Sequence, residues 1–560
     1  MSDATATSPS LRAGLRGVAP LDGRIEPWMA ALGDDHATIT QAFERFGSPV
    51  NLLEPTALGR NAGELTNAAR EAGVDDVRVF FARKANKALA FVDEARGLDL
   101  GVDVAGEREL RQTLDRGVAP ERIVVTAAVK PRPLLELCVT SGVTIVIDNA
   151  DELALLADVA AAAGSGPAVP IAVRLASDLG PDRLPTRFGL TEPEALELVD
   201  RYARAAGDEP ATNASGEASS AMGGGGGARS GAGEPVRTTR PLHITGVHFH
   251  LDGYAAADRM TALRQALAFV DALVDRGHAP TFVDIGGGIP MRYLDDADQW
   301  DAFWAAHCDG LLDGDPLTYD GHGLGLTVHD GAIIGRPNVY PAAQPLIRGA
   351  WLRQVLEAPA ATEAAAKQAT AGAPGAGATA EEATGEASPG SAPTREPQRL
   401  VPTIAEALNA RGLQLRCEPG RSLLDGCGVT AAQVVQRKQR RDGTWLIGLA
   451  MNRTQCRSTA DDLLVDPLLL PTGSSQAGSG DETGPIEGYL VGAYCIEREL
   501  LTWRRMTFPQ GVRVGDTVVF PNTAGYHMHI LESASHQIPL ARNVVVDATD
   551  HALTLDAIDV

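Results

Sequence analysis

The chain has 560 residues, with 49 Lys and Arg against 72 Asp and Glu, and a formal net charge of −23 at pH 7. This charge disfavours nucleic acid and anionic membrane surfaces as partners and favours small-molecule ligands. The six cysteines include no C-x-x-C pair, and neither a signal peptide nor an apolar run of about 18 residues occurs. We therefore expect a cytoplasmic protein, large enough for more than one domain.

Three internal segments are rich in small and polar residues and cannot bury enough apolar surface to offset the entropy of ordering. They are residues 206–238, 358–398 and 471–485. We expect them to be disordered surface insertions, and residues 1–20 to be a disordered N-terminus.

Short apolar strands alternate regularly with amphipathic helices from about residue 50 onward. The eight predicted strands are 77–83, 99–104, 122–127, 144–148, 169–175, 243–250, 281–285 and 413–417. Eight β/α units in succession predict an α/β fold, a (β/α)8 TIM barrel spanning residues 48–425.

The rhythm changes after residue 425 to short β-like runs separated by Gly, Asp and Pro. This pattern predicts a second, mostly β domain over residues 426–560. Residues 21–47 precede the barrel, and we assign them to the β domain, although their pattern is compatible with packing on either part.

Reactive groups of a TIM barrel lie at the carboxyl ends of its strands. Lys84 follows the first predicted strand, and His248 and His250 end the sixth. Residues 284–288 (Asp-Ile-Gly-Gly-Gly) end the seventh, and 418–421 (Glu-Pro-Gly-Arg) follow the eighth. We expect these side chains to meet at one rim of the barrel.

Eight short motifs occur in a characteristic order along the chain. They are A-x-K-A-N at 82–86, D-V-A at 103–105, R-F-G at 187–189, H-x-H at 248–250, D-I-G-G-G at 284–288, E-P-G-R at 418–421, G-x-x-C at 492–495 and A-G-Y at 524–526. In this order the chain resembles the fold-type III enzymes dependent on pyridoxal 5'-phosphate (PLP), which include the diaminopimelate, ornithine and arginine decarboxylases and the related alanine racemase. The resemblance covers residues 45–545 apart from the insertions.

The resemblance implies that Lys84 holds PLP as a Schiff base, into which the amino-acid substrate exchanges. It places Glu418 beside the pyridine nitrogen, where an anion keeps that nitrogen protonated and the ring a strong electron sink. Relatives similar to alanine racemase have an arginine there. Glu418 therefore favours decarboxylation, although an isolated lysine at a strand end is more often a solvated surface residue.

The phosphate site implied by the resemblance lies between strands seven and eight. Gly286, Gly287 and Gly288 let backbone N–H groups approach an anion, and Gly420, Arg421 and Tyr526 complete the site. His250 is expected to stack on the cofactor ring. Without their motifs, these glycines would indicate only a turn and the histidine only a core residue.

Cys495 corresponds to a cysteine that family decarboxylases contribute from one subunit to the active site of its partner. There it helps to return a proton to the substrate carbon after CO2 leaves. The resemblance therefore implies a homodimer with shared active sites. On residue type alone, a free cysteine would be a small buried apolar residue.

Three positions depart from the family pattern. Ile496 stands where the familiar decarboxylases have an acidic residue for the distal amino group of the substrate. Gly253 replaces a serine that binds phosphate. The segment 451–457 lacks the Arg-Pro-x-x-Tyr that holds a substrate carboxylate, for which Arg453 or Arg457 could substitute. Because an apolar side chain cannot pair with an ammonium group, we expect a substrate whose distal end is uncharged or acidic.

Two other functions remain open from the sequence. One is a PLP-dependent racemase or epimerase, and the other is a catalytically silent regulatory homologue. The residues indicate neither the substrate nor its stereochemistry, and no metal is expected.

Overall fold

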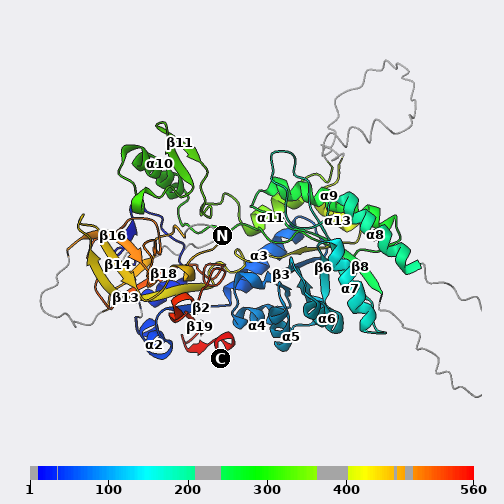
Figure 1. Cartoon of the computed structure of the whole chain (residues 1–560), viewed down its shortest axis with the longest axis horizontal. Coiled ribbons are helices and arrows are strands. Elements are labelled where there is room, and N and C mark those ends of the chain that lie inside the picture. Colours follow the sequence, from blue (N-terminus) through cyan, green and yellow to red (C-terminus); the bar gives the residue numbers. More distant parts are fainter. Residues whose placement is uncertain (1–10, 35, 208–240, 362–400, 459–462, 473–483) are drawn as a thin grey trace, which may run out of the picture.

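A computed structural model describes residues 11–34, 36–207, 241–361, 401–458, 463–472 and 484–560. The described residues form a parallel barrel and a mostly antiparallel sheet that lie side by side (Figure 1). The predicted insertions 206–238, 358–398 and 471–485 fall mainly outside these ranges. Among the residues that the structure describes, no helix has the length and apolar character needed to cross a membrane.

The barrel is closed by parallel strands in the order β12-β3-β4-β5-β6-β7-β8-β9. This confirms the predicted TIM barrel, because each strand coincides with a predicted one to within a few residues. The strands are β3 (Val77–Ala82), β4 (Gly101–Val104), β5 (Ile123–Val125), β6 (Thr144–Ile147), β7 (Val169–Leu175), β8 (Leu242–Phe249), β9 (Phe282–Asp284) and β12 (Gln414–Cys417). Five apolar side chains fill part of its interior, namely Phe80, Val124, Val146, Ala172 and Phe282.

Helices surround the barrel and bury one apolar face each against its strands. They are α3 (Ala57–Glu71), α4 (Leu89–Gly97), α5 (Glu107–Asp115), α6 (Arg132–Ser141), α7 (Ala150–Ala162), α8 (Glu192–Gly207), α9 (Ala256–Val274), α11 (Arg348–Leu356) and α13 (Ile404–Ala410). This shell leaves the carboxyl ends of the strands as the place for a site.

The second part is a ten-stranded sheet with the main order β1-β17-β16-β14-β13-β2-β19-β20, to which β18 and β15 are added beside β13. Its strands are β1 (Arg16–Gly17), β2 (Val50–Leu53), β13 (Gly428–Gln439), β14 (Trp445–Leu449), β15 (Leu468–Leu470), β16 (Ile486–Val491), β17 (Met506–Phe508), β18 (Thr517–Phe520), β19 (Arg542–Val546) and β20 (Leu553–Leu555). β2 lies within the range 48–425 predicted for the barrel, but it pairs with β13 and β19 instead. The chain thus contributes to the sheet before it enters the barrel.

The N-terminal prediction needs a correction. Residues 11–20 are not disordered, because Leu11 and Leu15 are buried and β1 pairs with β17. Helices α1 (Pro27–Asp34) and α2 (His36–Phe46) pack their apolar residues against the sheet. The apolar spacing of Leu11 and Leu15 outweighs the small and polar residues around them.

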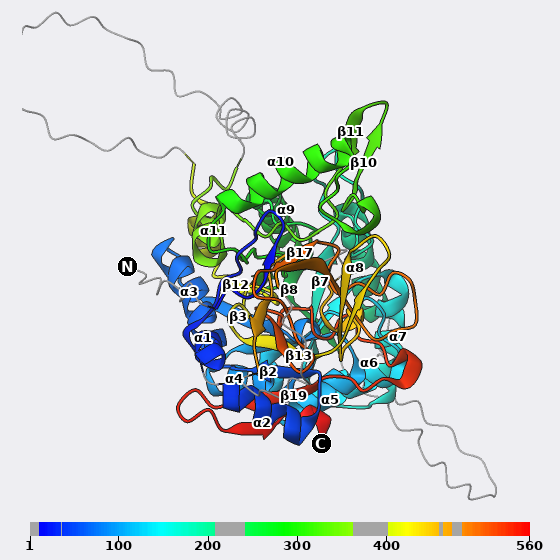
Figure 2. The same cartoon turned by 90° about the vertical axis from the view of Figure 1, so that its left-hand side faces the viewer.

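The segment between β9 and α11, residues 285–347, was not predicted as a structural unit and is called the excursion below. It contains α10 (Asp298–Asp313) and the hairpin of β10 (Leu326–His329) and β11 (Ala332–Gly335). Figure 2 shows it above the sheet, and Phe303 and Tyr340 share an apolar cluster with Leu464 and Trp503 of the second part. The excursion therefore links the barrel to the sheet.

Candidate active site

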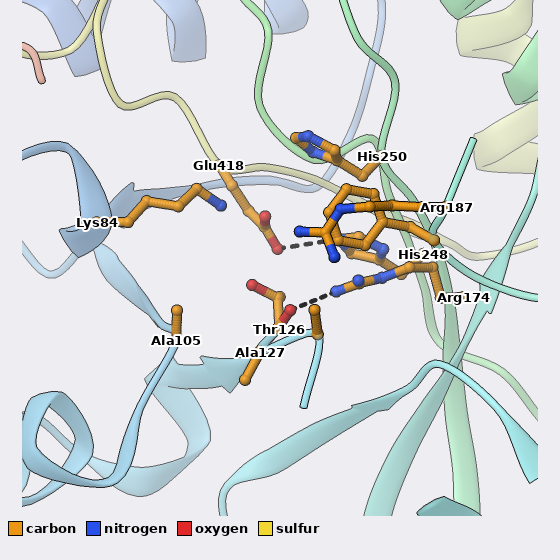
Figure 3. A pocket seen from close by; sticks show the side chains of 11 residues that line it. Lys84, Ala105, Thr126, Ala127, Arg174, Arg187, His248, His250 and Glu418 are labelled. Atoms are coloured by element: carbon orange, nitrogen blue, oxygen red, sulfur yellow. Dashed lines mark hydrogen bonds and ion pairs between the residues drawn. The ribbon is translucent and has the colours of Figure 1, made fainter. Parts of the chain in front are cut away.

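A cavity of about 270 Å³ opens at the carboxyl ends of the barrel strands (Figure 3). It is lined by Lys84, Ala105, Thr126, Ala127, Ala128, Arg174, Arg187, Phe188, His248, His250 and Glu418. The residues come from the ends of β3, β4, β5, β7, β8 and β12 and the loops that follow them, which is the rim where the sequence places reactive groups.

Lys84 lies directly after β3 in a short 3-10 turn, Arg83–Ala85, and its amine points into the cavity. Nζ is 3.1 Å from Oδ2 of Asp103, and the other oxygen of Asp103 accepts a hydrogen bond of 2.5 Å from Thr126. Burial lowers the pKa of Lys84, but Asp103 and Glu418 more than offset this effect, so that its pKa lies above the usual range. The carboxylates thus hold the amine charged and oriented toward the cavity.

Glu418 is buried at the end of β12, and its carboxylate faces Lys84 across the cavity. One of its oxygens is 3.3 Å from Nε2 of His248, but the angle is not that of a hydrogen bond. The carboxyl group of Asp284 lies within hydrogen-bonding reach of Glu418, so the two buried groups can share a proton. Burial, together with the neighbouring Asp103, raises the pKa of Glu418 to about 8. A buried carboxyl group with a raised pKa binds a proton readily and can share it with a ligand in the cavity.

Asp284 lies behind Glu418 and accepts a hydrogen bond of 2.9 Å from the backbone N–H of Gly286. Burial and the charge of Glu418 raise the pKa of Asp284 to about 7. Burial lowers the pKa of His248 to about 3, so the imidazole is neutral. Ligand atoms of these three side chains lie within 4.8 Å of one another, which is also a donor set that a metal ion could use.

At the glycines of the predicted phosphate site, the backbone conformation or the close neighbours leave no room for a side chain. Gly286 and Gly288 have positive φ, at 63° and 74°. A Cβ on Gly287 would lie 2.9 Å from the carbonyl oxygen of Glu418, and one on Gly420 would lie 2.6 Å from the Tyr526 hydroxyl. Because these glycines have no side chain, an anion can come close to the backbone N–H groups.

Arg421 is a buried cation beside this loop. Its guanidinium donates to the Tyr293 hydroxyl at 2.9 Å and to the carbonyl oxygen of Gly525 at 3.2 Å, and lies 4.4 Å from the ring centroid of Tyr340. Within the described ranges, no carboxylate pairs with it and its Nε has no acceptor. A buried cation without an anion is costly, so this environment favours an anionic ligand.

His250 and Arg187 form the outer side of the cavity. The His250 ring packs edge-to-face on Phe188, with centroids 5.5 Å apart, and burial lowers its pKa well below the usual value. Arg187 lies over Phe188 and directs its guanidinium into the cavity. Arg174, by contrast, forms an ion pair with Asp148, in which Nη1 lies 3.0 Å from Oδ1.

Of the predicted site residues, only Lys84, His250 and Glu418 are among those that line this cavity. The six predicted phosphate-site residues do not line it, and neither do Cys495, Ile496, Arg453 and Arg457. Cys495 and Ile496 are exposed on the second part of the chain, Ile496 at 44%. Arg453 pairs with Glu499 at 3.6 Å, and Arg457 donates to the carbonyl oxygen of Leu500 at 3.0 Å. Their roles in the site stay predictions.

Several partners of the site were not foreseen from the sequence. Tyr293 and Tyr340 belong to the unpredicted excursion, and Arg259 lies in α9, where periodicity gives a charged residue no special meaning. The sequence held clues for two other residues, because Asp103 belongs to the D-V-A motif and Arg187 to the R-F-G motif, although neither was predicted as a site residue.

Comparison with known proteins agrees with this geometry. Residues 63–207 match the family model described as pyridoxal-dependent decarboxylase, pyridoxal binding domain. The diaminopimelate decarboxylase of Zymomonas mobilis is 27% identical over 45% of this chain and 54% of its own length. An uncharacterized protein of Sinorhizobium fredii, y4yA, is 27% identical over 90% of this chain and 89% of its own.

The fold is shared with solved decarboxylases. Diaminopimelate decarboxylase from Helicobacter pylori, complexed with L-lysine, superposes with a TM-score of 0.56 and 15% identity over 93% of this chain and 97% of that one. The arginine decarboxylase of Paramecium bursaria Chlorella virus, bound to agmatine, gives a TM-score of 0.55 and 14% identity over 90% and 98%. The chain is thus similar to PLP-dependent decarboxylases, in sequence over residues 63–207 and in fold over most of its length.

PLP is the cofactor of this family, and the residues present fit it. Lys84 offers the amine for its aldehyde, and the buried carboxyl group of Glu418, which faces the cavity, suits a ring nitrogen. The glycine loop and the unpaired Arg421 suit a phosphate. The same observations favour PLP over a metal ion as the partner of Glu418, because Lys84 and the phosphate loop then share one ligand.

The raised pKa of Glu418 predicts how the protein without cofactor responds to pH. Its folded pKa, about 8, exceeds the usual 4.5, so unfolding releases a proton between these values. Glu418 therefore lowers stability progressively as pH rises through this window. We expect the free energy of unfolding of Glu418→Gln, minus that of the wild type, to increase from pH 5 to pH 8.

Urea unfolding of both proteins at pH 5, 6.5 and 8 measures this difference. A matched control is Glu197→Gln, which removes an exposed carboxylate on α8. A difference for Glu418→Gln that stays constant or decreases with pH would contradict the account of a destabilised buried carboxylate.

Proposed function

We propose that this chain decarboxylates an amino acid with PLP bound to Lys84. The observation that carries the proposal is the buried carboxyl group of Glu418, which faces Lys84 across the cavity. When bound, PLP supplies a sink for the electron pair left behind by CO2. Glu418 keeps the proton on the ring nitrogen, which strengthens that sink and favours decarboxylation over racemisation.

The other residues of the cavity orient the reactants. Asp103 holds the amine of Lys84 at 3.1 Å, and His250 supports the cofactor ring from one side. The Thr126 hydroxyl donates a hydrogen bond to Asp103, and the Thr126 carbonyl oxygen accepts one from Arg174. These contacts fix the floor of the cavity. This arrangement keeps a single geometry for the bond to be broken.

The proposed substrate has an acidic or uncharged distal end. Arg187 projects into the cavity, and none of the described residues forms an ion pair with it. Ile496, at the position expected to read a distal amino group, offers no charge to an ammonium group. A cavity mouth with an unpaired guanidinium attracts a carboxylate and repels a second ammonium group.

Cys495 completes the proposed site from a partner subunit. It is exposed here and does not line the cavity that contains Lys84. Exposed Ile496 lies beside it, and apolar surface next to a thiol suits a subunit interface. In the dimer, Cys495 of the partner subunit would deliver the proton to the substrate carbon after CO2 leaves.

CO2 release from a panel of L- and D-amino acids tests the reaction. We expect CO2 from at least one acidic or uncharged amino acid in the presence of PLP, and a loss of about 1,000-fold or more in Lys84→Ala. Efficient turnover of lysine, ornithine or diaminopimelate would contradict the proposed substrate class. Loss of α-deuterium without CO2 would replace decarboxylation by racemisation, and no reaction with any amino acid would favour a silent homologue.

Arg187→Gln separates substrate recognition from chemistry in the same assay. We expect KM for an acidic substrate to rise about tenfold, with a smaller change in kcat, because the variant removes one charged interaction with the substrate. The control is Arg183→Gln, an exposed arginine of the same loop that pairs with Asp258. Equal effects of the two variants would remove Arg187 from substrate binding.

Subunit complementation tests the shared site. Lys84→Ala and Cys495→Ala are each expected to be inactive or strongly impaired, but a heterodimer of the two regains one intact site. Mixing equal amounts under exchange conditions should restore about a quarter of the wild-type activity, because half of the dimers carry one intact site of two. Activity no higher than the mean of the two variants alone would contradict an active site shared between subunits.

A further inference from the structure

Arg259, on the inner face of α9, is a fully buried arginine with an exposed fraction of 0%. No carboxylate of the described residues forms an ion pair with it, and burial lowers its pKa to about 10. Its Nε and Nη1 have no acceptor in the described part of the chain. Because a buried and unpaired charge is expensive, its position calls for a physical reason.

The Arg259 guanidinium joins the loops that follow β8 and β9. Nη2 donates to the carbonyl oxygens of Leu251 and Gly253 at 3.0 Å each, and to that of Gly287 at 3.2 Å. Gly288 leaves room for this contact, since a Cβ there would lie 2.0 Å from Nη2. A single side chain thus ties the glycine loop to the segment in which Gly253 stands instead of serine.

These three hydrogen bonds set the direction of the following N–H groups. In a planar trans peptide the C=O and N–H bonds point in opposite directions. Holding the oxygens of Leu251, Gly253 and Gly287 toward Arg259 therefore turns the N–H groups of Asp252, Tyr254 and Gly288 away from it. Among the residues described, none of these N–H groups donates to a protein acceptor.

We propose that Arg259 is a positioning residue for the phosphate of PLP. It orients backbone N–H groups of two loops as an anion site and adds positive potential behind them, which compensates for the absence of a serine hydroxyl at Gly253. A phosphate dianion in turn offsets the buried charges of Arg259 and Arg421. The proposal rests on the cofactor and not on the reaction, so its test needs no substrate.

The experiment compares PLP with pyridoxal, which lacks the phosphate. Both are titrated by absorbance into the full-length cofactor-free wild type, Arg259→Met and Arg259→Lys. We expect Arg259→Met to weaken PLP binding by about 10- to 100-fold, as for the removal of a buried charged hydrogen-bonding group, and to leave pyridoxal binding unchanged. Arg259→Lys should recover part of the PLP affinity, because it retains the charge without the fork of donors.

Arg264→Gln is the matched control, because Arg264 lies on the exposed face of the same helix and donates to the carbonyl oxygen of Pro359. It should bind PLP and pyridoxal like the wild type. The thermal midpoint of each cofactor-free protein is measured in parallel, and Arg259→Lys serves for the titration if Arg259→Met does not fold. Equal weakening of PLP and pyridoxal, or no weakening of either, would overturn the proposal. Failure of the decarboxylase proposal alone would leave the difference between PLP and pyridoxal intact.

Discussion

Unbalanced buried charge is the constraint on which this site depends. The carboxyl group of Glu418 is buried between Asp284 and the amine of Lys84, and in the predicted phosphate region Arg421 and Arg259 are buried without a carboxylate ion pair among the described residues. A ligand with a cationic ring nitrogen and an anionic phosphate satisfies both regions at once, which explains why such costly side chains are tolerated.

The fold supplies the rigidity that this charge pattern needs. Parallel strands fix the positions of Lys84, His248 and Glu418 at one rim, and apolar layers beneath them keep water out. The second part of the chain contributes Tyr526, whose backbone N–H donates to the carbonyl oxygen of Ala85 beside Lys84. β2 precedes the first barrel strand and β13 follows the last one, and these two strands pair in the sheet. Their pairing anchors the two parts to each other beside the site.

Much of the barrel could be predicted from the sequence, because buried parallel strands are continuous apolar runs such as 144–148 and their spacing repeats. The rim residues followed from strand ends, and motifs gave Lys84 and Glu418 their meaning. The place of β2 could not be predicted, since a four-residue apolar strand looks the same in either sheet. The burial of Leu15 could not be predicted for a similar reason, since two leucines are too short a pattern to define an element.

The parts of the site that sequence could not reveal are those formed by long-range contacts. Arg259 sits in an ordinary helical pattern, and only folding brings it against three carbonyl oxygens of two loops. Tyr293 and Tyr340 meet Arg421 because an excursion of the chain, without a recognisable repeat, folds back over the rim. Such contacts depend on the path of the chain and not on local periodicity.

Reduction with borohydride after incubation with PLP tests the central claim most directly, because it fixes the cofactor to the amine that holds it. Peptide mapping by mass spectrometry then locates the label. The account predicts one pyridoxyl group per chain, on Lys84, and its absence when Lys84 is replaced by alanine. A label on another lysine, or none at saturating PLP, would contradict the assignment of the site.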